Sequence, residues 1–255
     1  MLRVTQFSDP HLTSDPAGLK GFDTFERFRR CVEHAKRNQV AAQDELYILS
    51  GDIAHDESRE TYQALKDFMV STGVTWFCIP GNHDAPSLLH EVFPEHSPSV
   101  ERGYMSFLHT SKVEVLLFSS HLSGEVAGEL NETSLKRLSQ SNGRAKLVAL
   151  HHPPLTLNDP EFDAMALRNQ ERFWDCVENN ADIVGVLFGH AHRAHRELRV
   201  IGAREVSVMC CPSTAFQYGS DTEAPYGFDP TRLGYRTLSY KSELGLQSSV
   251  HWLEA

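Results

Sequence analysis

The strongest constraint on the fold is a rhythm in which short apolar segments alternate with amphipathic ones along the chain. The short segments have the length and composition of buried strands, and the longer ones have apolar positions at helical spacing. Strands are predicted at Leu2–Ser8, Glu45–Ser50, Val74–Ile79, Tyr104–Leu108, Val113–Ser119, Lys146–Leu150 and Ile183–Phe188. Helices are predicted at Phe22–Asn38, Glu57–Ser71, Glu132–Ser139 and Met165–Asn179.

The end of the chain differs, because it reads as a run of β segments. These are predicted at His195–Val200, Glu205–Met209, Tyr235–Tyr240 and Ser248–Trp252. Alternating strands and helices followed by a β-rich end indicate a layered α/β fold. The chain has no repeat and no linker, so one domain over residues 1–255 is expected. The segment 215–232 reads as a long loop, and we expect it to line a substrate cleft or an oligomer contact.

Composition narrows the class of protein. The chain has 40% hydrophobic and 23% charged residues, as globular proteins do, and its apolar runs are too short to cross a bilayer. A strand pattern starts at once, which argues against a signal peptide, so a cytoplasmic location is expected. The five scattered cysteines form no Cys-x-x-Cys pair and are interpreted as free thiols.

Net charge bears on the partners. A charge of −10 argues against nucleic-acid binding, which needs a basic surface. An anionic substrate would also be repelled, unless bound metal cations dominate the local field. The 14 histidines fit that solution, because imidazole is the commonest metal ligand.

Five polar clusters follow predicted strands. They are Ser8-Asp9-Pro10-His11, Gly51-Asp52-Ile53-Ala54-His55-Asp56, Gly81-Asn82-His83-Asp84, His151-His152-Pro153-Pro154 and Gly189-His190-Ala191-His192. The carboxyl ends of strands form the usual ligand-binding edge of an α/β sheet. Residues i and i+2 of an extended strand end point the same way, so Asp9 with His11, and His190 with His192, can converge. The preceding glycines permit tight turns.

The ligand types predict a metal site. Carboxylate, amide and imidazole groups without thiolate suit Mn, Fe, Co or Zn better than the oxygen-only shells of Mg or Ca. The candidate ligands are Asp9, His11, Asp52, Asn82, His190 and His192. One member of the pair His151 and His152 is expected to be a ligand, and His151 is favoured.

Other histidines carry less information. His34, His55, His90, His96, His109 and His195 are interpreted as solvated or hydrogen-bonded side chains. His121 follows a strand and is a weaker candidate for the cleft. The chain contains no Gly-x-Ser-x-Gly motif and no Walker-type loop, so serine-hydrolase and P-loop chemistry lack their motifs.

At the five clusters the sequence resembles the calcineurin-like metallophosphoesterases, and within them the bacterial class III cyclic-nucleotide phosphodiesterases. Further matches are Gly51 to Ser58, Gly128-Glu129-Leu130, Leu167-Arg168-Asn169, Pro212-Ser213-Thr214 with Gln217, and Gly234-Tyr235-Arg236. The resemblance implies a four-layer α/β/β/α sandwich with two metal ions. It implies that Asp9, His11 and His192 hold one ion, that Asn82, His151 and His190 hold the other, and that Asp52 bridges both.

The resemblance also implies roles near the substrate. His83 is expected to act at the leaving group, with Asp84 orienting it. Substrate contacts are expected from Asn82, His83 and His192, and less strongly from His121, Arg168 and Asn169.

The expected function is hydrolysis of 3′,5′-cyclic nucleotides, cyclic AMP above all, to 5′-monophosphates through a hydroxide that bridges the metals. Alternatives are a glycerophosphodiesterase or a broad-specificity metallophosphoesterase. A nuclease is disfavoured by the acidic charge, and a metal-free binding scaffold is disfavoured by the intact ligand set. The expected partner is a small phosphodiester, with no membrane and a possible homo-oligomer.

Overall fold

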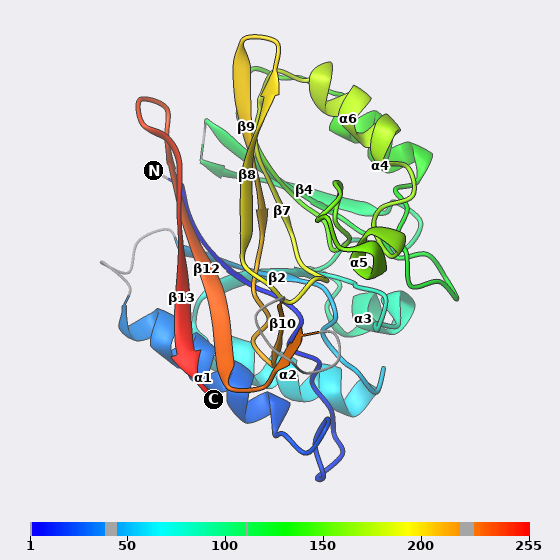
Figure 1. The fold of residues 1–255 in the computed structure, drawn as a ribbon, viewed down its shortest axis with the longest axis vertical. Helices are drawn as coiled ribbons and strands as arrows, with labels where there is room; N and C mark the ends of the chain where they lie inside the picture. The colour runs from blue at the N-terminus through cyan, green and yellow to red at the C-terminus, as the bar shows by residue number, and fades with distance from the viewer. Residues whose placement is uncertain (1, 39–44, 111, 220–226) are drawn as a thin grey trace.

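Two β-sheets pack face to face and carry helices on their outer sides (Figure 1). The computed structural model describes residues 2–38, 45–110, 112–219 and 227–255. Part of the predicted 215–232 loop, residues 220–226, therefore lies outside the described residues.

The first sheet has the strand order β13-β12-β1-β2-β3. Its three N-terminal strands run parallel, and β12 joins β1 antiparallel from the other end of the chain. The strands span Leu2–Phe7 (β1), Glu45–Ser50 (β2), Thr75–Ile79 (β3), Arg232–Lys241 (β12) and Gly245–Glu254 (β13).

The second sheet has the order β4-β5-β6-β7-β9-β8, with a parallel centre and antiparallel edges. Its strands span Tyr104–Thr110 (β4), Val113–Phe118 (β5), Ala145–Ala149 (β6), Ile183–Phe188 (β7), His195–Ile201 (β8) and Arg204–Cys210 (β9). A separate short pair joins Gln217–Tyr218 (β10) to Phe228–Asp229 (β11).

Capping side chains fix several helix starts. Asp23 accepts a hydrogen bond from the backbone of Glu26, and Asn131 caps its helix through Ser134 in the same way. The helices span Thr24–Arg37 (α1), Arg59–Thr72 (α2), Pro86–Val92 (α3), Glu132–Leu138 (α4), Pro160–Ala164 (α5) and Gln170–Glu178 (α6).

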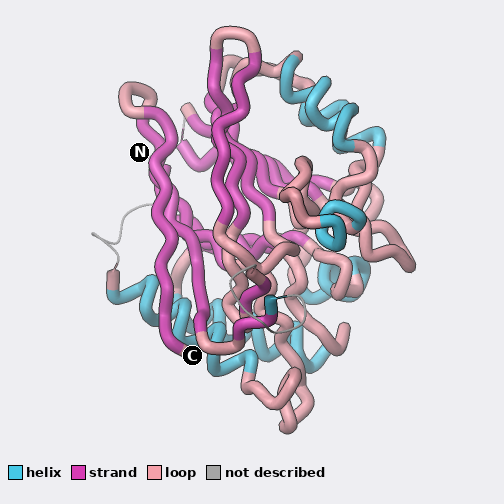
Figure 2. Tube along the Cα trace, in the orientation of Figure 1, coloured by secondary structure: helices cyan, strands magenta, loops and turns pink. Residues whose placement is uncertain are grey.

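Three apolar layers hold these elements together. One lies between the first sheet and α1, α2 and α3, a second between the two sheets, and a third between the second sheet and α4, α5 and α6. The tube view separates the helices from the paired strands (Figure 2). The arrangement is a four-layer α/β/β/α sandwich, which confirms the predicted fold class.

Some predicted elements were wrong in extent. The helix predicted at Met165–Asn179 starts only at Gln170, because the preceding backbone bonds elsewhere: Leu167 donates to Pro153 O and Arg168 donates to Gly128 O. The short helices α3 and α5, each with proline in its first turn, were not predicted. Within the described ranges, no helix is both long enough and apolar enough to cross a membrane.

Candidate metal centre

The carboxyl ends of five parallel strands meet where the two sheets face each other. β1, β2 and β3 lead into the Asp9, Asp52 and Asn82 loops, while β6 and β7 lead into the His151 and His190 loops. Hydrogen bonds tie the two edges together: Gln6 Nε2 donates to Phe188 O at 3.0 Å, and His151 Nδ1 lies 2.8 Å from Ser50 O. The fold thus brings together clusters that are far apart in the sequence.

One group of ligand atoms comes from Asp9, His11 and His192. The Nε2 atoms of His11 and His192 are 3.0 Å apart, and His192 Nε2 is 3.4 Å from Asp9 Oδ1. All three side chains are buried. Together with Asp52 they form a cluster whose ligand atoms lie within 4.8 Å of one another.

A second group comes from Asn82, His151 and His190. Asn82 Oδ1 is 3.3 Å from His151 Nε2 and 3.0 Å from His190 Nδ1, and the two imidazole nitrogens are 3.2 Å apart. Asp52 lies between the groups, with Oδ2 3.5 Å from His11 Nε2 and Oδ1 3.3 Å from His151 Nε2.

These separations fit two metal ions. Ligand atoms about 2.1 Å from a common ion stand about 3–3.5 Å from each other. His192 Nδ1 lies 3.0 Å from Phe216 O, so it carries the proton and leaves the lone pair on Nε2. In the matching tautomer of His11 the two facing Nε2 lone pairs would both be satisfied by an ion between them. Imidazole, carboxylate and amide donors without thiolate are the set expected for such ions.

The protonation of the ligands also suits a cation. Burial lowers the pKa of His11 to about 3 and that of His190 to about 3, which keeps both imidazoles neutral. Burial alone would raise the pKa of Asp52, but His151 outweighs it and holds that pKa well below its usual range. The Asp52 carboxylate is therefore charged, and the lone pairs of His11 and His190 are available.

The backbone at these ligands is left-handed. Asp9, His11, Asp52, His190 and His192 have φ between 43° and 67°. Non-glycine residues seldom adopt such angles, and they cluster at functional sites. This corrects the expectation of extended strand ends: His190 and His192 do not converge but face the second and the first group respectively.

Glycine permits the close packing around Asp52. A Cβ on Gly81 would lie 2.1 Å from Asp52 Oδ1, and one on Gly51 would lie 2.2 Å from His151 Nδ1. Gly51 also has φ +102°. Any side chain at either position would displace a candidate ligand.

His83 and Asp84 follow Asn82 but lie in different surroundings. The backbone N–H of His83 donates to Asp52 Oδ1 at 2.9 Å. His83 also lines the ligand pocket, whose wall includes the candidate ligands His11, Asp52, Asn82, His190 and His192. The carboxylate of Asp84 is buried and accepts bonds from the backbone of Ile53, Ala54 and Gly81.

Tyr62 Oη also donates to Asp84, at 2.9 Å. Burial raises the pKa of the Asp84 carboxyl to about 6. Among the described hydrogen bonds Asp84 is thus joined to the Asp52 loop and to α2, and not to the His83 ring as expected. Its contacts are those of a residue that holds the Asp52 and Asn82 loops against each other.

The structure separates the two adjacent histidines. His152 Nδ1 bonds to Ser120 Oγ at 2.7 Å and Nε2 bonds to Val126 O at 3.0 Å. Both nitrogens are therefore engaged outside the ligand groups, whereas His151 Nε2 faces Asp52 and Asn82.

Three weaker candidates lie elsewhere. Arg168 pairs with exposed Glu125 at 2.7 Å, and Asn169 bonds to both backbone groups of Leu130. Neither lines the ligand pocket in the described part of the chain. Asn169 is instead the N-cap residue of α6. His121 lines an adjoining hollow with Asn82 and His83.

The ligand pocket has a volume of about 330 Å³. Besides the polar groups it is lined by apolar and aromatic side chains, namely Leu19, Val126, Phe162, Met165, Phe216 and Tyr218. Phe216 and Tyr218 belong to the predicted 215–232 loop. His55, interpreted above as an ordinary histidine, also lines the pocket, and its Nδ1 lies 3.3 Å from His11 Nδ1. The sequence did not indicate this position, because His55 lies in a loop three residues after Asp52, where the alternation of a strand does not predict the direction of a side chain.

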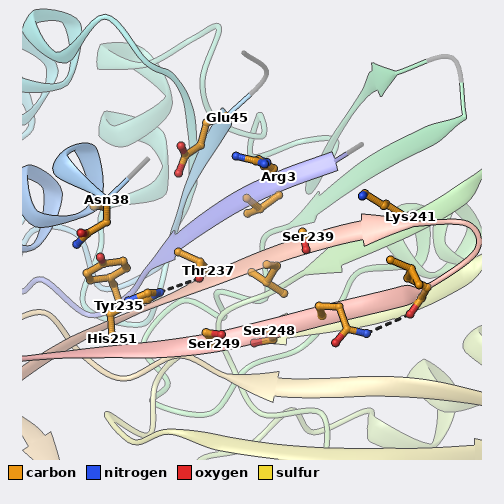
Figure 3. A pocket seen from close by; sticks show the side chains of 16 residues that line it. Arg3, Asn38, Glu45, Tyr235, Thr237, Ser239, Lys241, Ser248, Ser249 and His251 are labelled. Atoms are coloured by element: carbon orange, nitrogen blue, oxygen red, sulfur yellow. Dashed lines mark hydrogen bonds between the residues drawn. The ribbon is translucent and has the colours of Figure 1, made fainter. Parts of the chain in front are cut away.

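A second hollow, of about 390 Å³, lies on the first sheet (Figure 3). Tyr235, Thr237 and His251 line it, with His251 Nε2 2.8 Å from Thr237 Oγ1. It contains none of the candidate ligands, so the chemistry belongs to the ligand pocket.

Comparison with known proteins agrees with this geometry. Residues 2–194 match the family model of the calcineurin-like phosphoesterases. The chain is 28% identical to the 3′,5′-cyclic adenosine monophosphate phosphodiesterase CpdA of Vibrio vulnificus, over 99% of this chain and 90% of that protein. It is 26% identical to a 3′,5′-cyclic-nucleotide phosphodiesterase of Nostoc sp., over 93% of this chain and 87% of that protein.

A solved structure shares the fold. A dimetal phosphatase from Danio rerio superposes with a TM-score of 0.67 at 12% identity, covering 97% of this chain and 98% of that one. The family fold implies a dinuclear metal centre, and the His and Asp cluster is compatible with it. The chain therefore belongs to the calcineurin-like phosphoesterase family and is a metal-dependent phosphoric ester hydrolase.

Proposed function

We propose that this enzyme hydrolyses 3′,5′-cyclic nucleotides, with cyclic AMP preferred, to 5′-monophosphates. The observation that carries the proposal is the position of Asp52, whose two carboxylate oxygens face two separate groups of metal-ligand atoms. The names of the relatives in Vibrio vulnificus and Nostoc sp. support the choice of cyclic nucleotides.

In this proposal Asp9, His11 and His192 would hold one ion, Asn82, His151 and His190 would hold the other, and Asp52 would be shared by the two. Manganese and iron are the preferred pair, with zinc or cobalt as substitutes, because the donors are nitrogen and oxygen. When bound, two such ions supply Lewis acidity that lowers the pKa of a coordinated water and stabilises charge on the phosphate oxygens.

The remaining steps belong to side chains at the pocket. Asn82, His83 and His192 line it and would orient the phosphate. Water supplies the oxygen of the new P–O bond and loses one proton, the bond from phosphorus to the ribose 3′-oxygen breaks, and His83 donates a proton to that departing oxygen. The proton lost by water restores the one on His83, so the net reaction adds one water. The 5′-ester bond stays intact, so the product is the 5′-monophosphate.

The proposal covers partners and location as well. The partner is a small phosphodiester, and stable nucleic-acid binding is not expected from a chain with net charge −10. A cytoplasmic enzyme would suit the five free cysteines, since that compartment keeps thiols reduced. A homo-oligomer is compatible with the proposal.

A substrate panel with Mn²⁺-loaded protein tests it. The panel compares cyclic AMP, cyclic GMP, 2′,3′-cyclic nucleotides, glycerophosphodiesters and p-nitrophenyl esters, and the highest kcat/KM is expected for cyclic AMP. A higher value for glycerophosphodiesters would replace the proposal with the glycerophosphodiesterase alternative. Protein that binds less than about one metal per chain and hydrolyses no ester would be a scaffold instead.

A further inference from the structure

We propose that Phe162, Met165 and Tyr218 form a wall that binds the nucleobase of the substrate. This aromatic wall lines the same pocket as the ligand groups. The inference rests on the proposed function and deepens it, because it assigns the part of the substrate that does not react. The substrate class is a cyclic phosphodiester that carries a flat heteroaromatic ring.

The wall stands directly beside both ligand groups. The Tyr218 ring centroid lies 5.1 Å from that of His192, and the Phe162 ring centroid lies 6.2 Å from that of His190. The two wall rings are 5.9 Å apart with an angle of 51° between their planes. A substrate held by its phosphate between His190 and His192 would therefore have its substituent next to these rings.

Backbone hydrogen bonds fix Tyr218 relative to the metal centre. Its N–H donates to His192 O at 3.0 Å, and His192 Nδ1 in turn bonds to Phe216 O at 3.0 Å. Tyr218 also pairs with Phe228 in the β10–β11 ladder. The backbone that carries the ring is thus tied directly to a candidate ligand.

Phe162 is fixed through the residue that follows His192. The guanidinium of Arg193 lies 4.6 Å from the Phe162 ring centroid and bonds to Asp159 Oδ2 at 2.7 Å. Asp159 is the N-cap of α5, the helix that carries Phe162. The 189–193 loop therefore positions both sides of the wall.

The surface of the wall suits a base better than a polar alcohol. Phe162 is nearly buried, with 7% of its surface exposed, whereas Tyr218 and Met165 are half-buried and offer the accessible apolar area. Val126, 49% exposed, lies at the same pocket. Stacking on such side chains accepts any base, because every base has a π-face. A glycerol substituent gains nothing from this contact.

The test compares cyclic AMP with 1-O-methylribose 3′,5′-cyclic phosphate, which keeps the reacting ring and leaving group but lacks the base. Stacking of one base is worth about tenfold or more in binding. We expect wild-type kcat/KM to favour cyclic AMP by at least that factor, and Tyr218→Leu to lose most of the preference through a raised KM. Tyr218→Phe keeps the ring and should keep the preference.

Tyr240→Leu is the matched control, since Tyr240 is also half-buried but lies outside the ligand pocket. It should leave the preference unchanged. Equal losses on both esters in Tyr218→Leu would overturn the wall. If wild-type protein hydrolyses neither cyclic ester, both the proposed function and the wall are wrong. Equal wild-type rates on the two esters would overturn the wall alone.

A measurement on wild-type protein does not depend on how the variants fold. AMP and ribose 5-phosphate share the phosphate and the sugar and differ in the base. The inhibition constant of AMP should be at least about tenfold lower than that of ribose 5-phosphate. Equal inhibition by the two would contradict a base-binding wall.

Discussion

Asp52 differs from the other candidate ligands at the scale of single residues, because its two oxygens face different groups. Removing a residue that only hydrogen-bonds to a metal ligand already costs ~10–100-fold in metal affinity or activity. We expect Asp52→Ala to lose more than ~100-fold in kcat/KM and to bind fewer metal ions than any other ligand variant. Elemental analysis by mass spectrometry, with Asp9→Ala as the comparison, measures this. Both metals retained at near-normal turnover would show that Asp52 is not shared.

His83 invites a different prediction at this scale, because it lines the pocket but belongs to neither group of ligand atoms. His83→Ala should keep both metals while kcat on cyclic AMP falls by ~10²–10⁴-fold. A p-nitrophenyl diester has a weakly basic leaving group that needs little protonation, so its loss should be much smaller. His90→Ala, outside the pocket, is the control. Equal loss on both substrates would favour phosphate binding, and loss of a metal would make His83 a ligand.

Single residues were predictable from the sequence where a motif carries chemistry. The clusters around Asp9, Asp52 and His190 predict metal ligands, because few other kinds of site combine glycine, carboxylate and imidazole at the ends of strands. The partners of Asp84 and the wall residue Phe162 had no such signal. Their roles depend on contacts across the fold, such as Asp84 with Tyr62 and Phe162 with Arg193, which no local pattern encodes.

At the scale of secondary-structure elements, an ion pair between Lys146 and Asp182 connects β6 to the start of β7. Lys146 in β6 is fully buried, and its Nζ lies 2.6 Å from Asp182 Oδ2, just before β7. Burial would raise the pKa of Asp182, but Lys146 and the backbone of Asn142 outweigh it and lower the pKa to about 2. Because the folded pKa is depressed, the pair stabilises the protein above pH ~4 and loses that contribution as the pH falls toward 2.

The variant Asp182→Asn tests this pair. It removes the nearer of the two anions beside Lys146 and leaves Glu114 Oε2 3.9 Å from Nζ, so we expect a loss of ~1–3 kcal/mol in the free energy of unfolding at pH 7. Urea unfolding at several pH values should show the gap to wild type shrinking below pH ~4. A gap that is constant down to pH 2 would mean that the pair does not titrate as described. Asp175→Asn, on α6, provides a control.

Element boundaries were predictable where apolar periodicity is strong, as in β2, and less so where tertiary contacts decide. β12 and β13 extend beyond the predicted Tyr235–Tyr240 and Ser248–Trp252, because ladder hydrogen bonds continue through residues that alternate weakly. The start of α6 was misplaced since Asn169 bonds to Leu130 across the chain.

At the scale of the whole molecule, the sequence predicts an α/β layered class but not which sheet each strand joins. The pairing of β12 with β1 brings the end of the chain beside its beginning, and no local pattern indicates it. A second long-range contact reaches the site directly: Ser213 Oγ donates to Asp9 O at 2.8 Å, just before the chain reaches Phe216 and Tyr218. The metal centre is thus assembled by nearly the whole fold.

A site assembled in this way couples metal binding to global stability. Ions that bind only the folded chain stabilise it by ~2.7 kcal/mol at a hundredfold excess over Kd, which raises Tm by ~5–10 °C for a chain of this size. Without metal, burial opposes a charged His151, but Asp52 outweighs burial and raises its pKa to about 9. That proton stabilises the metal-free protein fully below pH ~6.5, and its contribution is lost as the pH rises through about 9.

If His151 is a ligand, a metal ion would take the place of that proton in the loaded protein, and the same loss would not occur. The Tm difference between metal-loaded and chelator-treated protein should therefore widen as the pH is raised from 7 toward 9. Differential scanning calorimetry at matched ionic strength measures it, and Asp52→Ala should show almost no metal-dependent shift at any pH. A difference that narrows over this range would mean that no proton leaves His151 when metal binds, and His151 would then not be a ligand.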